Sequence, residues 1–208
     1  MTKPIVNWTW SDGIGHLPLC DNAPIEYGES YFDNYAKLAE TRMSADLTNV
    51  RCRMVEQFAG DRASVLDVGI GCGAFITEMC RRGHVVKGTD VNAKAKAWLK
   101  LRELYWDHKT PVDVMTMWDV LEHIEDPAVL FVVAAPIYIC VSMPIYMGER
   151  HALKSKHLKP GEHCWYFTES GLIRYMGRYG FECIHTSSPE VTLGREDIQS
   201  FVFKNLLR

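Results

Sequence analysis

Three glycines at alternate positions, Gly69, Gly71 and Gly73, follow a short apolar segment and precede a helical pattern. Because glycine has no side chain, it lets a backbone turn sharply and approach a ligand closely. In parallel α/β sheets, ligands bind beyond the carboxyl ends of the strands. Asp67 stands just before the turn, and Asp90 follows the next apolar segment, where an acid can accept hydrogen bonds from ribose hydroxyls. The spacing therefore predicts a nucleoside-binding loop.

Two nucleoside ligands fit this outline, NAD and S-adenosylmethionine (SAM). The dinucleotide fingerprint spaces its glycines as GxGxxG, whereas this chain has GxGxG. Asp67 would repel a pyrophosphate, but it would attract the ammonium group of SAM, which carries no phosphate. The charges thus favour SAM as cofactor, with S-adenosylhomocysteine (SAH) as its product. A nicotinamide-dependent oxidoreductase is a distant alternative.

A first group of candidate catalytic side chains lies at residues 119–123. Asp119 and His123 are four residues apart, so they share a face if this turn is helical. The alternative is that Glu122 and His123 only brace the loop against the cofactor.

A second group lies at residues 151–168, which contain three histidines, three lysines and an aromatic run. His157 and His163 are candidate general bases, because neutral histidine titrates near working pH. The neighbouring lysines favour an anionic acceptor group. The alternative is a solvated basic turn with Trp165 and Phe167 in the core. His157 and His163 are six residues apart without an acid or thiol to complete a recognisable ligand set, so no metal is expected.

Helical patterns near the N-terminus predict a lid over the cofactor. Tyr31, Tyr35 and Arg42 fall near one helical face, and Arg42 could pair with the carboxylate of the methionine moiety. The alternative is an aromatic core with a surface arginine.

Apolar periodicity predicts strands that alternate with helices, which is typical of a parallel sheet covered on both faces. We expect an α/β, Rossmann-like, doubly wound and mostly parallel sheet with an antiparallel C-terminal hairpin at its edge. One domain spans 1–208, with an N-terminal arm and lid helices at 1–59 and the core at 60–208; residues 1–28 look like a surface arm. The predicted helices cover 30–40, 45–58, 75–82, 93–104, 128–134 and 168–179, and the predicted strands cover 64–68, 84–89, 112–117, 137–142, 181–187 and 200–204.

The composition excludes several classes of protein. The 208 residues are 47% hydrophobic and 24% charged, as in ordinary globular domains. A net charge of -3 argues against general nucleic-acid binding. Seven scattered cysteines without a CxxC pair, and no signal-peptide pattern, indicate reduced thiols in the cytoplasm. Residues 127–147 carry no charge and are long enough to span a bilayer, but three prolines and the strand pattern predict a buried helix and strand, with no membrane partner.

Four stretches together resemble class I SAM-dependent methyltransferases: VLDVGIGCGAF (65–75), GTDVN (88–92), VDVMTMWDVLEHIEDP (112–127) and HCWYFTESGLIRYMGRYGFE (163–182). The most similar group is the broad one with the ubiquinone and menaquinone methyltransferases and many bacterial and phage proteins. The resemblance covers roughly residues 30–205. It implies these positions for the cofactor: Asp67 and Gly69 at the methionine end, Gly71 and Gly73 in the turn, Asp90 at the ribose, Val91 at the adenine, and Trp118 and Asp119 facing the reacting methyl group.

The segment between Asp90 and Asp113 departs from the family pattern. It has only about twenty residues, whereas the family usually fits a further strand there, with an acid that reads the adenine amino group. Residues 104–107 could be a stub of that strand, with Asp107 either as this acid or as a solvated turn residue.

The sequence argues against two classes of DNA methyltransferase and so narrows the choice of methyl acceptor. Trp118 and Asp119 replace the Pro-Pro-aromatic signature of DNA amino-methyltransferases, and no Pro-Cys dipeptide supplies the nucleophile of cytosine C5 enzymes. We expect a small-molecule acceptor. The alternatives are a macromolecule, tRNA or protein, supported by the basic loop at 150–159, and a non-catalytic SAM-binding protein. The oligomeric state is left open.

Overall fold

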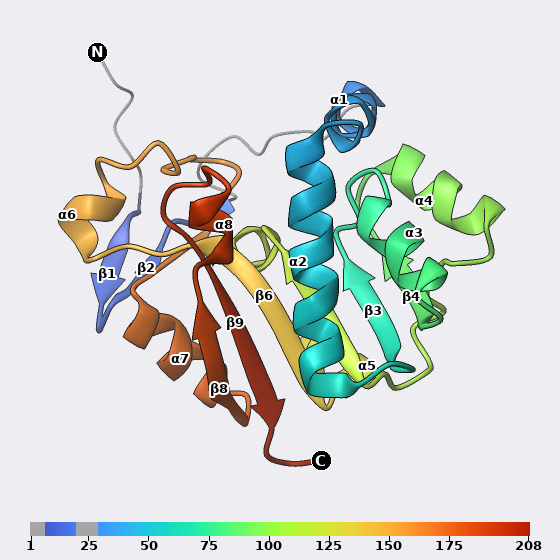
Figure 1. Ribbon diagram of the computed structural model, residues 1–208. Helices are drawn as coiled ribbons and strands as arrows, with labels where there is room; N and C mark the ends of the chain where they lie inside the picture. The colour runs from blue at the N-terminus through green and yellow to red at the C-terminus, as the bar shows by residue number, and fades with distance from the viewer. Residues whose placement is uncertain (1–6, 20–28) are drawn as a thin grey trace.

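A six-stranded sheet forms the centre of the computed structural model, which describes residues 7–19 and 29–208, apart from the side chains of 29–31 and 35. The strand order is β4-β3-β5-β6-β9-β8 (Figure 1). The strands are β3 (Ser64–Val68), β4 (Val85–Thr89), β5 (Val114–Trp118), β6 (Tyr138–Pro144), β8 (Phe181–Ser187) and β9 (Ile198–Asn205). The first four are parallel, and β9 runs antiparallel to both β6 and β8. The predicted fold class is therefore confirmed.

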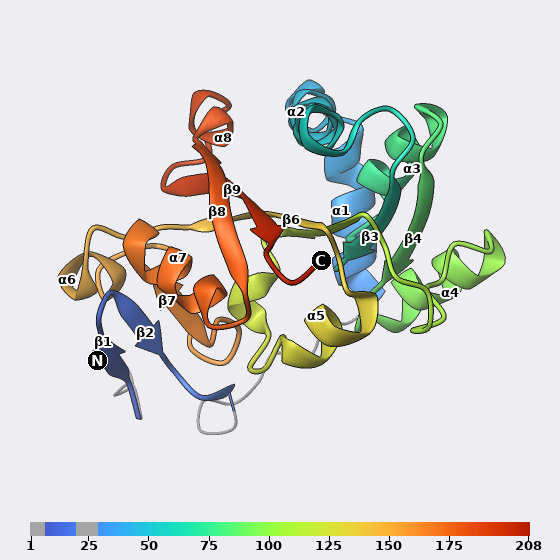
Figure 2. The same cartoon turned by 90° about the horizontal axis from the view of Figure 1, so that it is seen from below.

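Helices cover both faces of this sheet (Figure 2). The helices α2 (Arg42–Ala59), α3 (Ala74–Arg81) and α4 (Ala93–Leu101) bury apolar side chains in one core, and α5 (Ala128–Ala134) and α7 (Glu169–Gly177) do so in the other. Helix α1 (Glu29–Ala39) packs against α2 and α4, beyond the end of β3 (Figure 1). It thus lies at the carboxyl edge of the sheet, the edge at which the parallel strands end.

The uncharged stretch 127–147 becomes buried structure, as the sequence predicts. It contains α5 and β6, and six of the seven residues of β6 are buried. A strand covered on both faces needs apolar residues at consecutive positions, which explains the continuous run. In the described ranges 7–19 and 29–208, no helix is long and apolar enough to cross a membrane.

The N-terminal residues correct one expectation. Within the predicted surface arm, β1 (Thr9–Ser11) and β2 (Ile14–His16) form a hairpin that pairs with β7 (Trp165–Phe167). Gly13 makes the hairpin turn with a φ of 75°, and a Cβ there would lie 2.2 Å from Thr168 Oγ1. These strands have three residues each, too few for an alternating pattern to show in the sequence.

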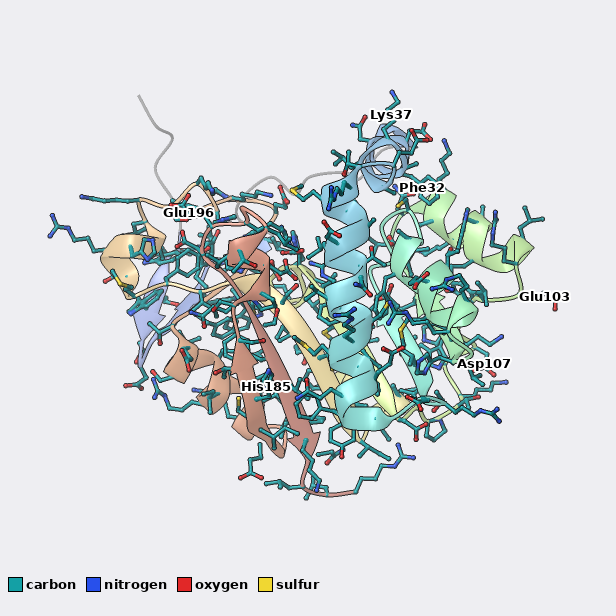
Figure 3. The ribbon with its side chains drawn as sticks, viewed as in Figure 1. Phe32, Lys37, Glu103, Asp107, His185 and Glu196 are labelled. Atoms are coloured by element: carbon teal, nitrogen blue, oxygen red, sulfur yellow. The ribbon has the colours of Figure 1, made fainter. Side chains whose placement is uncertain are left out.

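The expected stub beside β4 is a single parallel bridge between Gly88 and Tyr105. The N–H of Gly88 donates to the Leu104 carbonyl, and the N–H of Trp106 donates to the Gly88 carbonyl. Trp106 is buried, whereas Asp107 faces solvent beside β4 (Figure 3) and accepts the Lys109 N–H at 3.1 Å. Of the two readings of Asp107, this geometry favours the solvated turn residue.

Candidate functional site

The glycine turn between β3 and α3 has the conformation that the spacing predicts. Gly69, Gly71 and Gly73 have φ values of 75°, 57° and 84°, in the left-handed region. A Cβ at Gly69 would lie 2.5 Å from the Val120 side chain, and one at Gly73 would lie 2.6 Å from the Trp98 ring. The Gly69 N–H also donates to the Thr89 carbonyl at 2.8 Å. The turn is therefore tied to the end of β4 and has no room for larger residues at two of its positions.

Asp67 is buried on β3 directly before this turn. Its Oδ1 accepts a hydrogen bond from Thr116 Oγ1 on the neighbouring strand β5 at 2.7 Å. Burial raises the pKa of Asp67 to about 7, against the opposing effects of Thr116 and the positive charge of Arg51. A cation placed next to this carboxyl group would lower that pKa and hold the carboxylate in its charged form.

Asp90 stands at the end of β4, beside the same turn. Burial raises its pKa, although the backbone N–H groups of Asn92 and Gly71 stabilise its charged form. The next residue, Val91, is 76% exposed. A partly buried acid followed by an exposed apolar side chain offers a ribose contact next to an apolar surface.

Trp118 ends β5 and closes the site on the β5 side. Its ring contacts Phe75 edge-on, with 5.5 Å between centroids, and the Arg51 guanidinium lies 5.1 Å from the ring centroid. Its Nε1 is buried without a hydrogen-bond partner among the described residues. Buried N–H donors are rarely left unsatisfied, so this one is available to a bound ligand.

Asp119 takes part in a partly buried ion cluster, which we define as Arg51, Asp119, Glu190 and Arg195. Arg51 donates to Asp119 and to Glu190 at 2.9 Å each, and Arg195 donates to Asp119 at 2.9 and 3.0 Å and also to Glu190. Glu190, on the short helix α8 (Pro189–Thr192), is completely buried. The cluster thus links α2, the end of β5 and the segment between α8 and β9.

The surroundings of Asp119 argue against a role as a base. Burial disfavours its charged form, but Arg51 and Arg195 outweigh this and hold its pKa below the ordinary value. Asp119 and His123 do not share a helical face, because this turn is not one helix. Asp119 has a left-handed φ of 59° and lies outside the 3-10 helix η2 (Leu121–His123). Asp119 is therefore placed to orient neighbouring groups rather than to accept a proton.

His123 and His163 are brought together, with ring centroids 4.5 Å apart. Burial lowers the pKa of His123, and it lowers that of His163 to about 2, where the charge of His123 acts in the same direction. Both imidazoles are therefore neutral at neutral pH. Glu122 lies beside them, completely buried, and burial followed by the charge of Asp119 raises its pKa well above the ordinary value.

The remaining predicted residues are not part of this group. His157 lies apart and contacts the Glu196 carbonyl at 3.2 Å. The expectation for Arg42 is not met, because its side chain is 96% exposed and its ion pair is with Asp46 at 3.8 Å. Tyr31 and Tyr35 belong to α1, but their side chains lie outside the described part of the chain.

Three members of the ion cluster were not predicted from the sequence: Arg51, Glu190 and Arg195. Arg51 had a detectable signal, since it falls four residues after Leu47 and four before Val55, on the apolar face of α2. A charge on a buried face needs a buried partner. Glu190 and Arg195 lie in a segment without periodicity, and the sequence gives no comparable signal for them.

The ion cluster yields a prediction for stability. We expect Arg51→Met to lower the free energy of unfolding by about 3 kcal/mol, because it leaves the buried carboxylate of Glu190 and the partly buried one of Asp119 with one cation. The matched control is Arg53→Met, which changes an exposed arginine of the same helix and should stay within about 0.5 kcal/mol of the parent. Urea unfolding of the three proteins measures this, and equal losses for both variants would contradict the prediction.

The buried Asp67 yields a prediction for pH dependence. Its folded pKa of about 7 lies above the ordinary value of 3.8, so the folded state holds a proton that the unfolded state releases between these values. The Asp67 titration should therefore lower stability as pH rises from 4 to 7, whereas the lowered pKa of His163 acts in the opposite direction over this range. Asp67→Asn removes this titration and keeps an oxygen that can accept from Thr116. In urea unfolding across this range, the free energy of unfolding of the parent should fall relative to that of the variant; a constant difference between the two proteins would refute the assignment.

Comparison with known proteins identifies the family of this chain. Residues 35–186 match a family model described as a methyltransferase domain, which covers well over half of the chain. No curated protein matches the sequence. The match is to this broad family and not to the ubiquinone or menaquinone group in particular.

Solved structures show the same fold at low sequence identity. Magnesium protoporphyrin IX methyltransferase from Synechocystis PCC 6803, with bound SAH, has a TM-score of 0.62 and 16% identity over 86% of this chain and 96% of its own. A Burkholderia thailandensis 1,6-didemethyltoxoflavin-N1-methyltransferase, with its substrate and SAH, has a TM-score of 0.59 and 14% identity over 95% and 98%. A putative RNA methyltransferase from Pyrococcus horikoshii has a TM-score of 0.53 and 10% identity over 91% and 94%. From the family match, supported by this shared fold, the chain belongs to the methyltransferase-domain family.

Proposed function

We propose that this protein binds SAM at the carboxyl edge of β3, β4 and β5 and transfers its methyl group to a small-molecule acceptor. The observation that carries the proposal is a pair of acids, the buried Asp67 and the partly buried Asp90, beside a left-handed glycine turn. SAM is a cationic nucleoside without phosphate, so Asp67 attracts its ammonium group and would repel the pyrophosphate of a dinucleotide. Asp90 supplies the contact to the ribose.

The residues present fit each part of SAM. Asp67 and Gly69 are assigned to the methionine end and Asp90 to the ribose hydroxyls. Val91 offers apolar surface to the adenine, and the unsatisfied Nε1 of Trp118 offers a hydrogen-bond donor. Arg42 has no role in this arrangement.

The chemistry needs little from the protein beyond positioning. Bound SAM supplies a methyl group that its sulfonium already activates for displacement by the acceptor. Trp118 covers the site and excludes water, while Asp119, fixed by two arginines, orients the turn that follows β5. His123 is neutral at neutral pH and, with no metal bound, can accept a proton from the acceptor. Burial lowers the pKa of His163 to about 2, which makes it a much weaker base, and His157 is a more distant candidate.

A small molecule is favoured as acceptor over a macromolecule. Two proteins with this fold carry names that describe methylation of 1,6-didemethyltoxoflavin and of magnesium protoporphyrin IX, and the chain has a net charge of -3. The specific support for a macromolecule is the basic loop, here residues 150–159, with an RNA methyltransferase of similar fold. Nucleic-acid binding through that loop would weaken steeply with salt.

Cofactor binding can be tested with three variants. We expect Asp90→Ala to weaken SAH binding at least tenfold, a loss of about 1.4 kcal/mol for a charged hydrogen bond to the ribose. Gly71→Arg should abolish binding because its side chain would fill the turn. Asp107→Ala, which changes an exposed acid, should leave the affinity unchanged. Isothermal titration calorimetry measures all three, and full affinity in Gly71→Arg would refute this placement of the cofactor.

Methyl transfer is tested with labelled SAM and a cell lysate separated into nucleic-acid, protein and small-molecule fractions. We expect label in the small-molecule fraction, absent when Asp90→Ala replaces the parent protein. Label in nucleic acid or protein would instead support the macromolecular alternative. Binding of SAM without label in any fraction, across lysates of several sources, would favour a non-catalytic SAM-binding protein.

A further inference from the structure

We infer that Glu122, His123 and His163 form a binding site for a divalent transition-metal ion, with zinc as the best match to the donor set. One ligand atom from each residue lies within 4.8 Å of the others. Two imidazoles and one carboxylate are a common zinc-binding set, in which a further position stays open to water or substrate. The acid that completes this set is Glu122, which lies outside residues 151–168. The sequence alone predicted no metal because it showed no acid that completes a set with His163, and the proposal replaces that expectation.

Two buried atoms of this group lack a hydrogen-bond partner among the described residues, Glu122 Oε2 and His163 Nδ1. The two residues are only 1% and 3% exposed. Leaving a buried polar atom unsatisfied costs about 1–3 kcal/mol, so two such atoms at one place need an explanation. Both atoms can donate a lone pair, so a cation bound by this group would account for them.

His123 is already held in the orientation and tautomer that a metal ligand needs. Its Nδ1 lies 2.9 Å from the backbone carbonyl oxygen of Glu162. Because a carbonyl can only accept, Nδ1 carries the hydrogen and Nε2 keeps its lone pair. Metal-binding histidines usually make this second hydrogen bond to a carbonyl or carboxylate, which fixes the ring and strengthens the ligand.

The backbone fixes the distance between the two segments that carry the ligands. The Cys164 N–H donates to the Glu122 carbonyl at 2.8 Å, so the residue after His163 is tied to η2. The Tyr166 hydroxyl accepts the Lys159 N–H at 3.2 Å and donates to the His163 carbonyl at 3.3 Å. Only the side chains need to adjust, by about 1 Å, to reach zinc–ligand distances near 2.1 Å.

The charges around the group indicate what its open position would take. Lys159 and Glu162 form an ion pair at 2.8 Å, and the ion cluster around Asp119 has two cations and two anions. A divalent ion bound by the Glu122 carboxylate would therefore leave the site with one net positive charge. Resting on the proposed function, we assign the open position to an acceptor oxygen, a phenolic, enolic or carboxylic one, whose deprotonated form the ion would stabilise.

The test is metal binding by the full chain without an affinity tag, freed of metal with a chelator and measured in the absence of SAM. We expect calorimetry to show one zinc ion per chain with micromolar or tighter affinity, and cobalt to give the visible absorption of a site with four or five ligands. Magnesium should bind far more weakly, because imidazole is a poor ligand for it. A parent protein that binds neither zinc nor cobalt overturns the inference, and the two orphaned atoms then hold water.

Three variants locate the ion. Glu122→Gln and His163→Asn should each weaken zinc and cobalt binding about a hundredfold or more, since loss of a ligand exceeds the 10–100-fold effect of an outer contact. His157→Asn, in the same loop but directed to Glu196, should bind like the parent. Circular dichroism and SAH binding verify that each variant is folded. Zinc binding retained in both ligand variants would place the metal elsewhere in the chain and overturn the site. This experiment does not measure methyl transfer. If the protein binds the metal here but transfers no methyl group in the lysate experiment, only the proposed function is refuted.

Discussion

The ion cluster of Arg51, Asp119, Glu190 and Arg195 is the constraint on which the geometry of the site depends. Each carboxylate contacts both guanidinium groups, and Glu190 has no exposure to water. Because a buried carboxylate is tolerated only with its partners in place, α2, the end of β5 and the segment after α8 have to meet at one point. The turn after β5, with its left-handed Asp119, is thereby fixed, and η2 begins from a defined position.

This neutral cluster separates the acids at the carboxyl edge into two groups. Asp67 and Asp90 lie on the side of the glycine turn, and Glu122 lies beyond Asp119 with His123 and His163. In the proposed reaction the first group faces the cationic cofactor, and the second faces the acceptor. Trp118, packed between Phe75 and Arg51, stands where the two regions meet. One strand end, that of β5, therefore serves both halves of the proposed site.

The features found from sequence were those with a local pattern. The β3 strand has the predicted bounds, and the glycine turn has the backbone angles that its spacing requires. The small sheet was missed because its strands are too short to show a period, and its β7 strand is far along the chain from the hairpin. Glu122 and His163 are 41 residues apart, so only the tertiary fold shows them as one group. Arg51 was also missed, although its place on an apolar helix face was visible in the sequence.

The β4 edge shows how one shortened segment alters the proposed cofactor site. Between β4 and β5 the chain forms α4 and one bridge from Gly88 to Tyr105 in place of a full strand. Trp106 is buried beside that bridge, and Asp107 faces solvent. In the proposed complex, adenine then meets the apolar surface of Val91 rather than an acid. Apolar contact discriminates weakly between ligands of similar shape, whereas buried polar groups discriminate strongly, so the selectivity of this site resides at the ribose and methionine end.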